Sequence, residues 1–445
     1  MPQTGTRTLI VGLGKTGLSC ARFLAARGVE IAVTDSREHP PGLKELRNEM
    51  PDTAVFVGGF SEVALQRADQ LLVSPGIAVS TPFVIKARAM GLPVLGDIEL
   101  FAQHTRAPVI AITGSNGKST VTTLVGLMAE QAGREVRVGG NLGTPALDLI
   151  GEQEPDLYVL ELSSFQLEVT ESLRCVSATV LNISPDHMDR YATVQEYADA
   201  KARVFRHCDV AVLNRDDALV RGMGQSAARH VSFGLDTPSP DDYGIATRDG
   251  MRWLVHGDVR LMAASELRLH GNHNLLNALA ALALGGAAGL PMPAMLAALK
   301  LFRGLPHRME FITRVNDVDW YDDSKGTNVG ATVAAVAGLD GPLVLIAGGD
   351  GKGQDFMSLA AALVGKTRAA VLLGKDAAAI EMAIAGRFPV QRVKDMPAAV
   401  QAAASIAQPG DRVLLSPACS SLDMFENFEQ RGRVFAQAAR RLADG

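Results

Sequence analysis

Short runs of β-branched and other apolar residues alternate with Ala- and Leu-rich stretches along the whole 445-residue chain. The first run, residues 8–11, is followed by a glycine-rich turn and a helical stretch to about Ala26, and a second strand is expected at residues 30–34. Strands that alternate with helices build βαβ units on parallel sheets. The sequence therefore predicts an α/β fold, and at roughly 150 residues per domain the chain should form about three domains.

Three series of these units follow one another. The first closes near Pro93, and the second closes near Phe302 with a pair of Ala-rich helices. The expected domains are a Rossmann-like N-terminal domain, a central domain and a Rossmann-like C-terminal domain, over residues 1–94, 95–302 and 303–445. Residues 231–269 show strands and turns without clear helices, which predicts a small antiparallel region. Further strands are expected at residues 157–160, 178–182, 210–213, 343–347, 369–373 and 413–416.

Composition excludes several classes of protein. A net charge of −5 and a pI near 6.0 argue against a nucleic-acid binder. The longest uncharged stretch, residues 275–299, is interrupted by glycine and proline and predicts two buried helices rather than a membrane span. Residues 1–7 are polar and show no signal peptide. The four cysteines lack CxxC or CxxH spacing, so reduced thiols in a cytoplasmic protein are expected: Cys20, Cys175, Cys208 and Cys419.

The strongest local signal is Thr-Gly-Ser-Asn-Gly-Lys-Ser-Thr at residues 113–120, between a predicted strand and a predicted helix. Backbone N–H groups of such a loop surround phosphate oxygens at the positive end of the helix. Lys118 would neutralise the β- and γ-phosphates, and the Ser119 hydroxyl would bind Mg²⁺. Ile112 stands where the general P-loop has glycine, so an accidental turn stays open on the residues alone. The expected ATP contacts here are Gly114, Ser115, Asn116, Gly117, Lys118, Ser119 and Thr120.

A second glycine-rich turn, Gly12-Leu13-Gly14-Lys15-Thr16-Gly17, follows the first strand and fits GxGxxG. Asp35 ends the next strand, as the ribose-binding acid of a dinucleotide fingerprint does. The same glycines suit any nucleotide pyrophosphate, or only a tight turn. The motif favours a nucleotide other than NAD(P), and it leaves an NAD-dependent dehydrogenase and a bare turn open.

Two further segments supply groups that suit a metal ion. Glu161 ends an apolar strand, and Asp186-His187 follows the next strand. Open α/β sheets bind ligands at such strand ends, and a carboxylate and an imidazole near a P-loop serine could hold Mg²⁺. A surface or capping acid and a structural histidine remain the alternatives. Lys201 has the pattern of a solvated helix lysine. Of two asparagines at the start of an apolar helix, one fits an N-cap and the other a contact to adenine: Asn274 and Asn277.

Four polar clusters follow the expected C-terminal strands and could all face one cleft. They comprise residues 307–310, 322–328, 348–353 and 416–421. Arg308 and Lys352 suit anions such as phosphate or carboxylate. Simple turns are the alternative for any single cluster.

Taken together, these segments closely resemble the Mur ligase family of bacterial cell-wall synthesis, from Gly12 to Arg433. The motifs that carry the resemblance are Thr-Gly-Ser-Asn-Gly-Lys-Ser-Thr, Glu-Leu-Ser-Ser-Phe-Gln-Leu, Asp-His-Met-Asp-Arg-Tyr, Asp-Ser-Lys-Gly-Thr-Asn and Ser-Pro-Ala-Cys-Ser-Ser-Leu-Asp-Met-Phe. The resemblance implies three domains and an ATP-dependent ligase that activates a carboxylate as an acyl phosphate and couples it to an amine.

The resemblance also implies roles for individual residues. The N-terminal domain would hold a UDP-sugar rather than NAD, through Lys15, Thr16, Asp35, Ser36, Arg37 and Gly76. Asn141 and His187 would be further contacts of the UDP-sugar. ATP would bind to the P-loop and to Asn277, Arg308 and Asp323. Two Mg²⁺ ions would be held by Ser119, Glu161, His187 and Lys201, the last as a carbamate. The amino-acid substrate would meet Thr327, Lys352, Ser421 and Phe428. The implied catalytic residues are Lys118, His187 and Lys201.

The implied substrates are ATP, UDP-N-acetylmuramoyl-L-alanine and D-glutamate. Lys352 is not followed by Asp-Asn-Pro-Arg, which argues against family members that add diamino acids, and Gly326 replaces a common alanine. A cytoplasmic monomer without a nucleic-acid or membrane partner is expected. The residues do not choose between D- and L-glutamate. A ligase like folylpolyglutamate synthase and an ATP-driven switch or scaffold protein remain the other readings.

Overall fold

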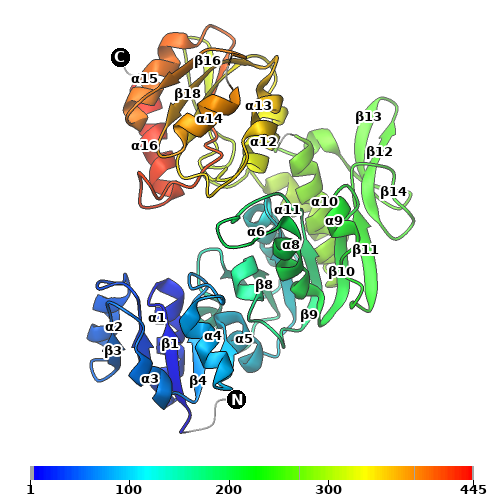
Figure 1. Cartoon of the computed structure of the whole chain (residues 1–445). Helices are drawn as coiled ribbons and strands as arrows, with labels where there is room; N and C mark the ends of the chain where they lie inside the picture. The colour runs from blue at the N-terminus through cyan, green and yellow to red at the C-terminus, as the bar shows by residue number, and fades with distance from the viewer. Residues whose placement is uncertain (1–4, 270, 385, 443–445) are drawn as a thin grey trace. The chain divides into compact units, whose positions relative to one another are not determined.

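The described residues form three sheets, and the chain divides into two compact units (Figure 1). The computed structural model describes residues 5–269, 271–384 and 386–442, so part of the polar N-terminal segment lies outside it. Unit 1 comprises Met1–Ile183, Gln195–Ala264 and Leu276–Lys300, and unit 2 comprises Ser184–Val194, Ser265–Leu275 and Leu301–Gly445. The predicted α/β class is confirmed, whereas the domain boundaries at 94/95 and 302/303 stay predictions.

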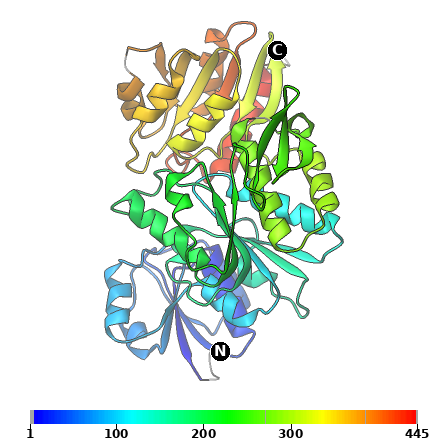
Figure 2. The same ribbon diagram turned by 90° about the vertical axis from the view of Figure 1, so that its right-hand side faces the viewer.

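The first sheet belongs to unit 1 and is parallel, with helices on both faces (Figure 2). Its elements are β1 (Arg7–Val11), α1 (Lys15–Ala25), β2 (Glu30–Thr34), α2 (Leu43–Glu49), β3 (Ala54–Phe56), α3 (Glu62–Arg67), β4 (Gln70–Val73), α4 (Pro82–Ala89) and β5 (Val94–Leu95). The strand order is β3-β2-β1-β4-β5. Ile10 and Leu72 face one apolar cluster, and Leu9 and Leu71 face another, because successive side chains point to opposite faces of a strand.

A nine-stranded central sheet has the order β14-β13-β12-β11-β10-β9-β6-β8-β7. Its strands are β6 (Val109–Thr113), β7 (Val136–Gly140), β8 (Leu157–Glu161), β9 (Cys175–Val180), β10 (Cys208–Asn214), β11 (Arg229–Phe233), β12 (Tyr243–Arg248), β13 (Met251–His256) and β14 (Val259–Ala263). Its helices are α5 (Asp97–His104), α6 (Lys118–Gln131), η1 (Ala146–Leu149), α7 (Ser164–Leu167), α8 (Val194–Ala202), η2 (Arg203–Phe205), α9 (Ala218–Arg221), η3 (Ala264–Glu266), α10 (Asn272–Ala287) and α11 (Met292–Leu301).

Two predictions for this part of the chain are confirmed. The antiparallel region expected within residues 231–269 is β12 to β14, which pair antiparallel and extend the sheet beyond β11. The uncharged stretch 275–299 lies in α10 and α11, which bury apolar side chains. Throughout the described residues, no helix is long and apolar enough to cross a membrane.

The third sheet belongs to unit 2 and has the order β15-β16-β20-β17-β18-β19. Its elements are β15 (Glu310–Val315), β16 (Val318–Asp322), α12 (Val329–Gly338), β17 (Leu343–Gly348), α13 (Met357–Leu363), β18 (Thr367–Leu373), α14 (Ala377–Ile384), β19 (Val390–Arg392), α15 (Met396–Ile406), β20 (Arg412–Leu415) and α16 (Phe428–Arg441). Leu345 packs with α12 to α14 on one face, and Ile346 packs with α15 and α16 on the other. Among the strands described for this sheet, only β15 runs antiparallel, against β16.

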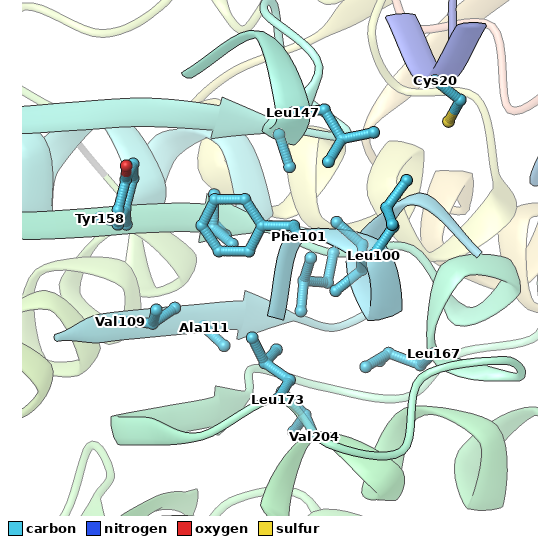
Figure 3. Packing of buried hydrophobic residues seen from close by; sticks show 14 of the residues in the cluster. Cys20, Leu100, Phe101, Val109, Ala111, Leu147, Tyr158, Leu167, Leu173 and Val204 are labelled. Carbon is cyan, nitrogen blue, oxygen red and sulfur yellow. The ribbon is translucent and has the colours of Figure 1, made fainter. Parts of the chain in front are cut away.

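A continuous apolar cluster joins the first sheet to the central sheet within unit 1. Figure 3 shows Leu100 and Phe101 of α5 amid Cys20, Leu147 and Tyr158, which come from α1, η1 and β8. The Phe101 and Tyr158 rings meet edge to face with their centroids 5.0 Å apart, a preferred aromatic geometry. All four cysteines are buried and free. Burial raises the pKa of the Cys208 and Cys419 thiols to about 12, so these thiols are poor nucleophiles.

Asp97, the first residue of α5, is a buried carboxylate in this unit. Its Oδ2 accepts a hydrogen bond from the Gln166 side chain at 2.8 Å. Burial raises the pKa of Asp97 to about 6, although that hydrogen bond acts to lower it. Glu99 shows the opposite balance: burial acts to raise its pKa, but hydrogen bonds from Ser172 and Glu171 outweigh burial and lower it. When both acids of this helix are ionised, Asp97 therefore destabilises the fold, whereas Glu99 stabilises it.

We expect Asp97→Asn to raise the melting temperature at about pH 8. The folded-state pKa of about 6 lies above the ordinary 3.8. The protonated Asp97 carboxyl therefore stabilises the fold at low pH, and this contribution is lost as the pH rises through about 6. Asparagine keeps an acceptor for Gln166 without ionising, so the gain should be on the order of 1–2 kcal/mol. Thermal unfolding at two pH values measures it, because the gain should shrink below about pH 5.

Glu99→Gln is the matched control, and it should lower the melting temperature at about pH 8, because the ionised Glu99 is the form that the fold stabilises. A lower melting temperature for Asp97→Asn than for wild type at that pH would contradict the prediction.

Candidate active site

The P-loop lies between β6 and α6, as the sequence predicts. Gly117 caps α6 with a φ of +87°, a conformation that glycine adopts at no steric cost. A Cβ at this position would also lie 2.4 Å from Oδ1 of Asn277. The close approach places Asn277 of α10, one of the residues expected to bind ATP, directly beside the loop. The positive end of a 14-residue helix therefore faces the loop, as phosphate binding requires.

Lys118 is folded back over its own loop. Its Nζ donates hydrogen bonds to the carbonyl oxygens of Gly114 and Ser115, at 2.8 and 2.9 Å. The Asn116 N–H donates to Oδ1 of Asn182 at 2.8 Å. These contacts fix the ammonium group within the loop that is expected to surround phosphate oxygens.

Glu161 bridges two other predicted site residues at the end of β8. Its Oε2 accepts a hydrogen bond from the Ser119 hydroxyl, and its Oε1 accepts one from the Asn141 side chain, each at 2.7 Å. Ser119 and Glu161 are both buried. Carboxylate and hydroxyl oxygens are the donors that Mg²⁺ prefers, so these two residues fit the ion expected here. Asn141, expected on the sugar side, thus contacts the same carboxylate as the P-loop serine.

Lys201 is not a solvated lysine, and the expectation from its pattern was wrong. Its side chain is only 1% exposed, because α8 packs it toward the start of the P-loop. Nζ lies 3.3 Å from Oγ1 of Thr113 and 4.5 Å from the centre of the Tyr197 ring. The Ser115 hydroxyl in turn donates to the Tyr197 hydroxyl at 3.4 Å. Lys201 is therefore part of the P-loop surroundings.

The residues expected to bind the UDP-sugar in the first sheet follow the carboxyl ends of β1, β2 and β4, where open α/β sheets bind ligands. Lys15, Ser36, Arg37 and Gly76 are exposed and Thr16 is half-buried. The Lys15 ammonium donates to the Gly143 carbonyl at 2.5 Å.

Asp35 differs from these residues because it is buried and its carboxylate is already bonded. It accepts hydrogen bonds from the Leu13 N–H at 2.7 Å and from three N–H groups of Arg37 at 2.7 to 2.9 Å. Burial acts to raise the pKa of Asp35, but these bonds outweigh it and lower the pKa. A carboxylate with these hydrogen bonds orients Arg37 and does not offer itself to a ribose. This argues against the interpretation of the GxGxxG turn as an NAD site.

His187 lies in the segment Ser184–Val194 of unit 2, next to the buried Asp186. The Asp186 carboxylate accepts hydrogen bonds from the His187 N–H at 2.9 Å, from the Asn328 side chain at 3.2 Å and from Lys352 Nζ at 3.3 Å. This carboxylate therefore ties the histidine segment to two of the polar clusters of the third sheet.

Main-chain hydrogen bonds join all four polar clusters of the third sheet. The Lys325 N–H donates to the His307 carbonyl and the Ala418 N–H to the Gly326 carbonyl, each at 3.0 Å. Asp350 and Ser420 form an antiparallel bridge. The prediction that every cluster follows a strand was wrong for residues 307–310, which precede β15. Because β15 is antiparallel, its start nevertheless lies at the edge where β16 ends.

Asp323, expected to bind ATP, is buried in this group of loops. Its carboxylate accepts hydrogen bonds from the Ser416 hydroxyl at 2.7 Å and from the Met309 N–H at 3.3 Å. Burial raises the pKa of Asp323 to about 7, while the Ser416 hydrogen bond and the Arg308 charge act to lower it. Arg308 is thus close enough to influence the acid with which it is expected to share ATP.

The sequence reasoning assigned no role to two groups beside these loops. His307 Nδ1 lies 2.7 Å from Oδ2 of Asp322, which raises the histidine pKa, and Glu310 accepts from the His307 N–H. Buried Arg431 of α16 contacts two of the loops. A signal for Arg431 existed: it stands four residues before Phe435, on the buried face of α16.

Left-handed backbone conformations gather at the same loops. Of eight non-glycine residues with positive φ in the described part of the chain, five lie in or beside the predicted site segments: His187, His307, Met309, Lys352 and Ala418. Such conformations cost about 1–3 kcal/mol each and concentrate at functional sites.

Family models match in three successive stretches. Residues 6–96 match the Mur ligase MurD-like N-terminal domain, residues 112–285 the Mur ligase middle domain, and residues 307–419 the Mur ligase glutamate ligase domain. Solved structures with the same fold include the UDP-N-acetylmuramate–alanine ligase MurC of Thermotoga maritima. It has a TM-score of 0.62 and 18% identity, over 99% of this chain and all of that one.

Curated relatives are much closer in sequence. The chain is 56% identical to the UDP-N-acetylmuramoylalanine–D-glutamate ligase of Nitrosococcus oceani, over 99% of this chain and 98% of that protein. It is 54% identical to the ligase of the same name from Pseudomonas putida, over 98% and 97%. With full-length relatives at this identity and matches to all three domain models, the chain belongs to the Mur ligase family.

Proposed function

We propose that the chain is an ATP-dependent ligase that joins D-glutamate to UDP-N-acetylmuramoyl-L-alanine in peptidoglycan precursor synthesis. The contact that carries this proposal is the hydrogen bond between Ser119 and Glu161, which sets oxygen donors for a metal beside the P-loop lysine. The substrates follow from the name that the full-length relatives carry, because the residues alone do not choose the glutamate enantiomer.

The reaction has two steps. A carboxylate oxygen of the alanyl group attacks the γ-phosphorus of ATP, the bond from that phosphorus to the β,γ-bridging oxygen breaks, and ADP leaves. The glutamate amine then attacks the acyl carbon. The tetrahedral intermediate expels inorganic phosphate and loses the amine proton, which leaves an amide. Phosphate replaces hydroxide as the leaving group, and this is why ATP is consumed.

In the first step, Lys118 and the P-loop N–H groups stabilise charge on the transferring phosphoryl group. Arg308, Asp323 and Asn277 are assigned to ATP as well. Mg²⁺ would be held by Ser119, Glu161 and His187, and carbamylated Lys201 would support a second ion. Such ions neutralise charge on phosphate oxygens.

The two organic substrates are assigned to different sheets. Lys15, Thr16, Ser36, Arg37, Gly76 and Asn141 would bind the UDP-sugar, with Asp35 holding Arg37 and with His187 as a further contact. Thr327, Lys352, Ser421 and Phe428 would bind glutamate. Lys352 already carries a carboxylate partner in Asp186 at 3.3 Å, which supports its assignment to a carboxylate of the substrate. We further propose a cytoplasmic monomer without nucleic-acid or membrane partners, in keeping with the net charge of −5.

Phosphate release with ATP and Mg²⁺, with each organic substrate omitted in turn, tests the proposal. Release should require both UDP-N-acetylmuramoyl-L-alanine and D-glutamate. Release that occurs with L-glutamate but not with D-glutamate, while the UDP-sugar is present, would keep the mechanism and change the substrate. Release that is indifferent to both substrates would instead favour an ATP-driven switch.

We expect Lys118→Ala to lower kcat by about a hundredfold or more, since one preorganised charge contact is lost from the transition state. The exposed Lys44 in α2 provides the control, and Lys44→Ala should keep the wild-type rate. Coupled-assay kinetics on both variants measure the difference. Full ligase turnover by Lys118→Ala would refute the role of the P-loop.

Lys201 is expected to be carbamylated. The neutral amine would add CO₂ at Nζ and release one proton, and the resulting anion offers oxygen donors to a metal ion. Burial supports this assignment, because removing an ammonium group from water is unfavourable. Protein equilibrated with ¹³C-bicarbonate should show one carbamate carbon in its NMR spectrum, and Lys201→Arg should lose both that signal and most of the activity. A wild-type spectrum without the signal, in a protein of full activity, would reject the carbamate.

A further inference from the structure

Arg431 is a buried cation that contacts only neutral oxygens among the described residues. Its side chain is 2% exposed. Nε donates to the Ser324 hydroxyl at 3.0 Å, Nη2 to the Ser324 carbonyl at 2.8 Å, and Nη1 to the Cys419 carbonyl at 3.1 Å. Burial lowers its pKa to about 10. A buried charge is costly, because its hydrogen bonds must compensate for the lost contacts with water.

The three hydrogen bonds join two loops that belong to different strands. Ser324 follows β16, and Cys419 follows β20. A guanidinium group offers several donors in a fixed plane, so one side chain can hold both segments at a set separation. The Ser324 hydroxyl, which accepts from Arg431, also donates to the Phe428 carbonyl at 2.8 Å. The contact thereby reaches the first turn of α16 as well.

The residues assigned to glutamate are all close to this network in the chain. Thr327 lies three residues after Ser324, Ser421 lies two residues after Cys419, and Phe428 accepts the Ser324 hydrogen bond. Lys352 lies two residues after Asp350, which forms the bridge with Ser420. Arg431 therefore contacts the main chain from which the amino-acid site would be built.

We propose that Arg431 is a positioning residue that sets the geometry of the glutamate site by fixing the loops at Ser324 and Cys419. This inference rests on the proposed function for the identity of the ligand. Arg431 itself would touch no substrate. Its contribution would appear chiefly in the affinity for the amino acid, and much less in the affinity for ATP, which is assigned mainly to the P-loop.

The kinetic test uses Arg431→Lys, which keeps the charge but cannot span three acceptors in one plane. The KM for D-glutamate should rise by about ten- to a hundredfold, the equivalent of one or two lost charge-assisted hydrogen bonds. The KM for UDP-N-acetylmuramoyl-L-alanine should change by less than about twofold, since most residues assigned to it lie outside these loops. The KM for ATP should rise less than that for D-glutamate, because only Arg308 and Asp323 of its assigned residues belong to these loops. Ser324→Ala removes only the hydroxyl and should raise the KM for D-glutamate by a smaller factor.

A merely structural role would give a different pattern. Leu363→Ala is the matched control, because Leu363 is fully buried in unit 2 and ends α13 before the amino end of β18, at the sheet edge opposite the loops. It should lower the melting temperature and leave all three KM values near those of wild type. An Arg431→Lys variant with an unchanged KM for D-glutamate, or with all three KM values raised by the same factor, would overturn the inference.

Hydrogen exchange provides a readout that does not depend on the ligand. Amides of residues 324–328 and 416–421 should exchange faster in Arg431→Lys than in wild type, while those of β18 should be unchanged. Equal exchange in both proteins would overturn the inference by itself. Wild-type protein that releases no phosphate with D-glutamate would instead refute the proposed function, and the exchange data would still decide whether Arg431 holds the loops.

Discussion

Burial of the first and third sheets on both faces is the constraint on which the rest of the structure depends. In the third sheet, alternate residues of β17 belong to two separate apolar clusters, so neither face is left for a ligand. Polar groups can then gather only where strands end. Parallel strands put their carboxyl ends at one edge, and the antiparallel β15 adds its amino end to the same edge. Residues distant in sequence are thereby brought together by strand direction alone.

Within the loops at these edges, the buried acidic side chains have specific hydrogen-bond partners. Glu161 accepts from Ser119 and Asn141, and Asp35 accepts from Leu13 and Arg37. Asp97, with a single side-chain hydrogen bond from Gln166, is the acid whose pKa burial raises to about 6. Asp35 and Asp97 thus show that burial and hydrogen bonds act on the pKa in opposite directions, and that the larger effect sets the direction of the shift.

Sequence patterns predicted the features that follow from local chemistry. The P-loop, the strands around it and the α/β class could be derived because glycine positions and apolar runs act over a few residues. Lys201 could not, because its burial depends on how α8 packs toward Thr113, a residue distant in the chain. Arg431 was missed for the same reason. His307 and Asp322 belong to two of the predicted polar clusters, but their pairing was not predicted. A charged residue on the apolar face of a helix, as Arg431 is, was the one available sign.

The two units prepare for anions in different ways. In unit 1 the ammonium of Lys118 is bonded to two carbonyls of its own loop, so its side chain is already ordered before a phosphate arrives. A phosphate oxygen is a stronger acceptor than a neutral carbonyl, and the ordering cost of the lysine no longer counts against binding. In unit 2 the expected anion site is ordered by contacts of the main chain. Left-handed residues such as Lys352 and Ala418 hold loops that cross-strand hydrogen bonds and Arg431 tie together. A single lysine can be ordered by its own loop, whereas a site built from four loops needs contacts that hold the loops to one another.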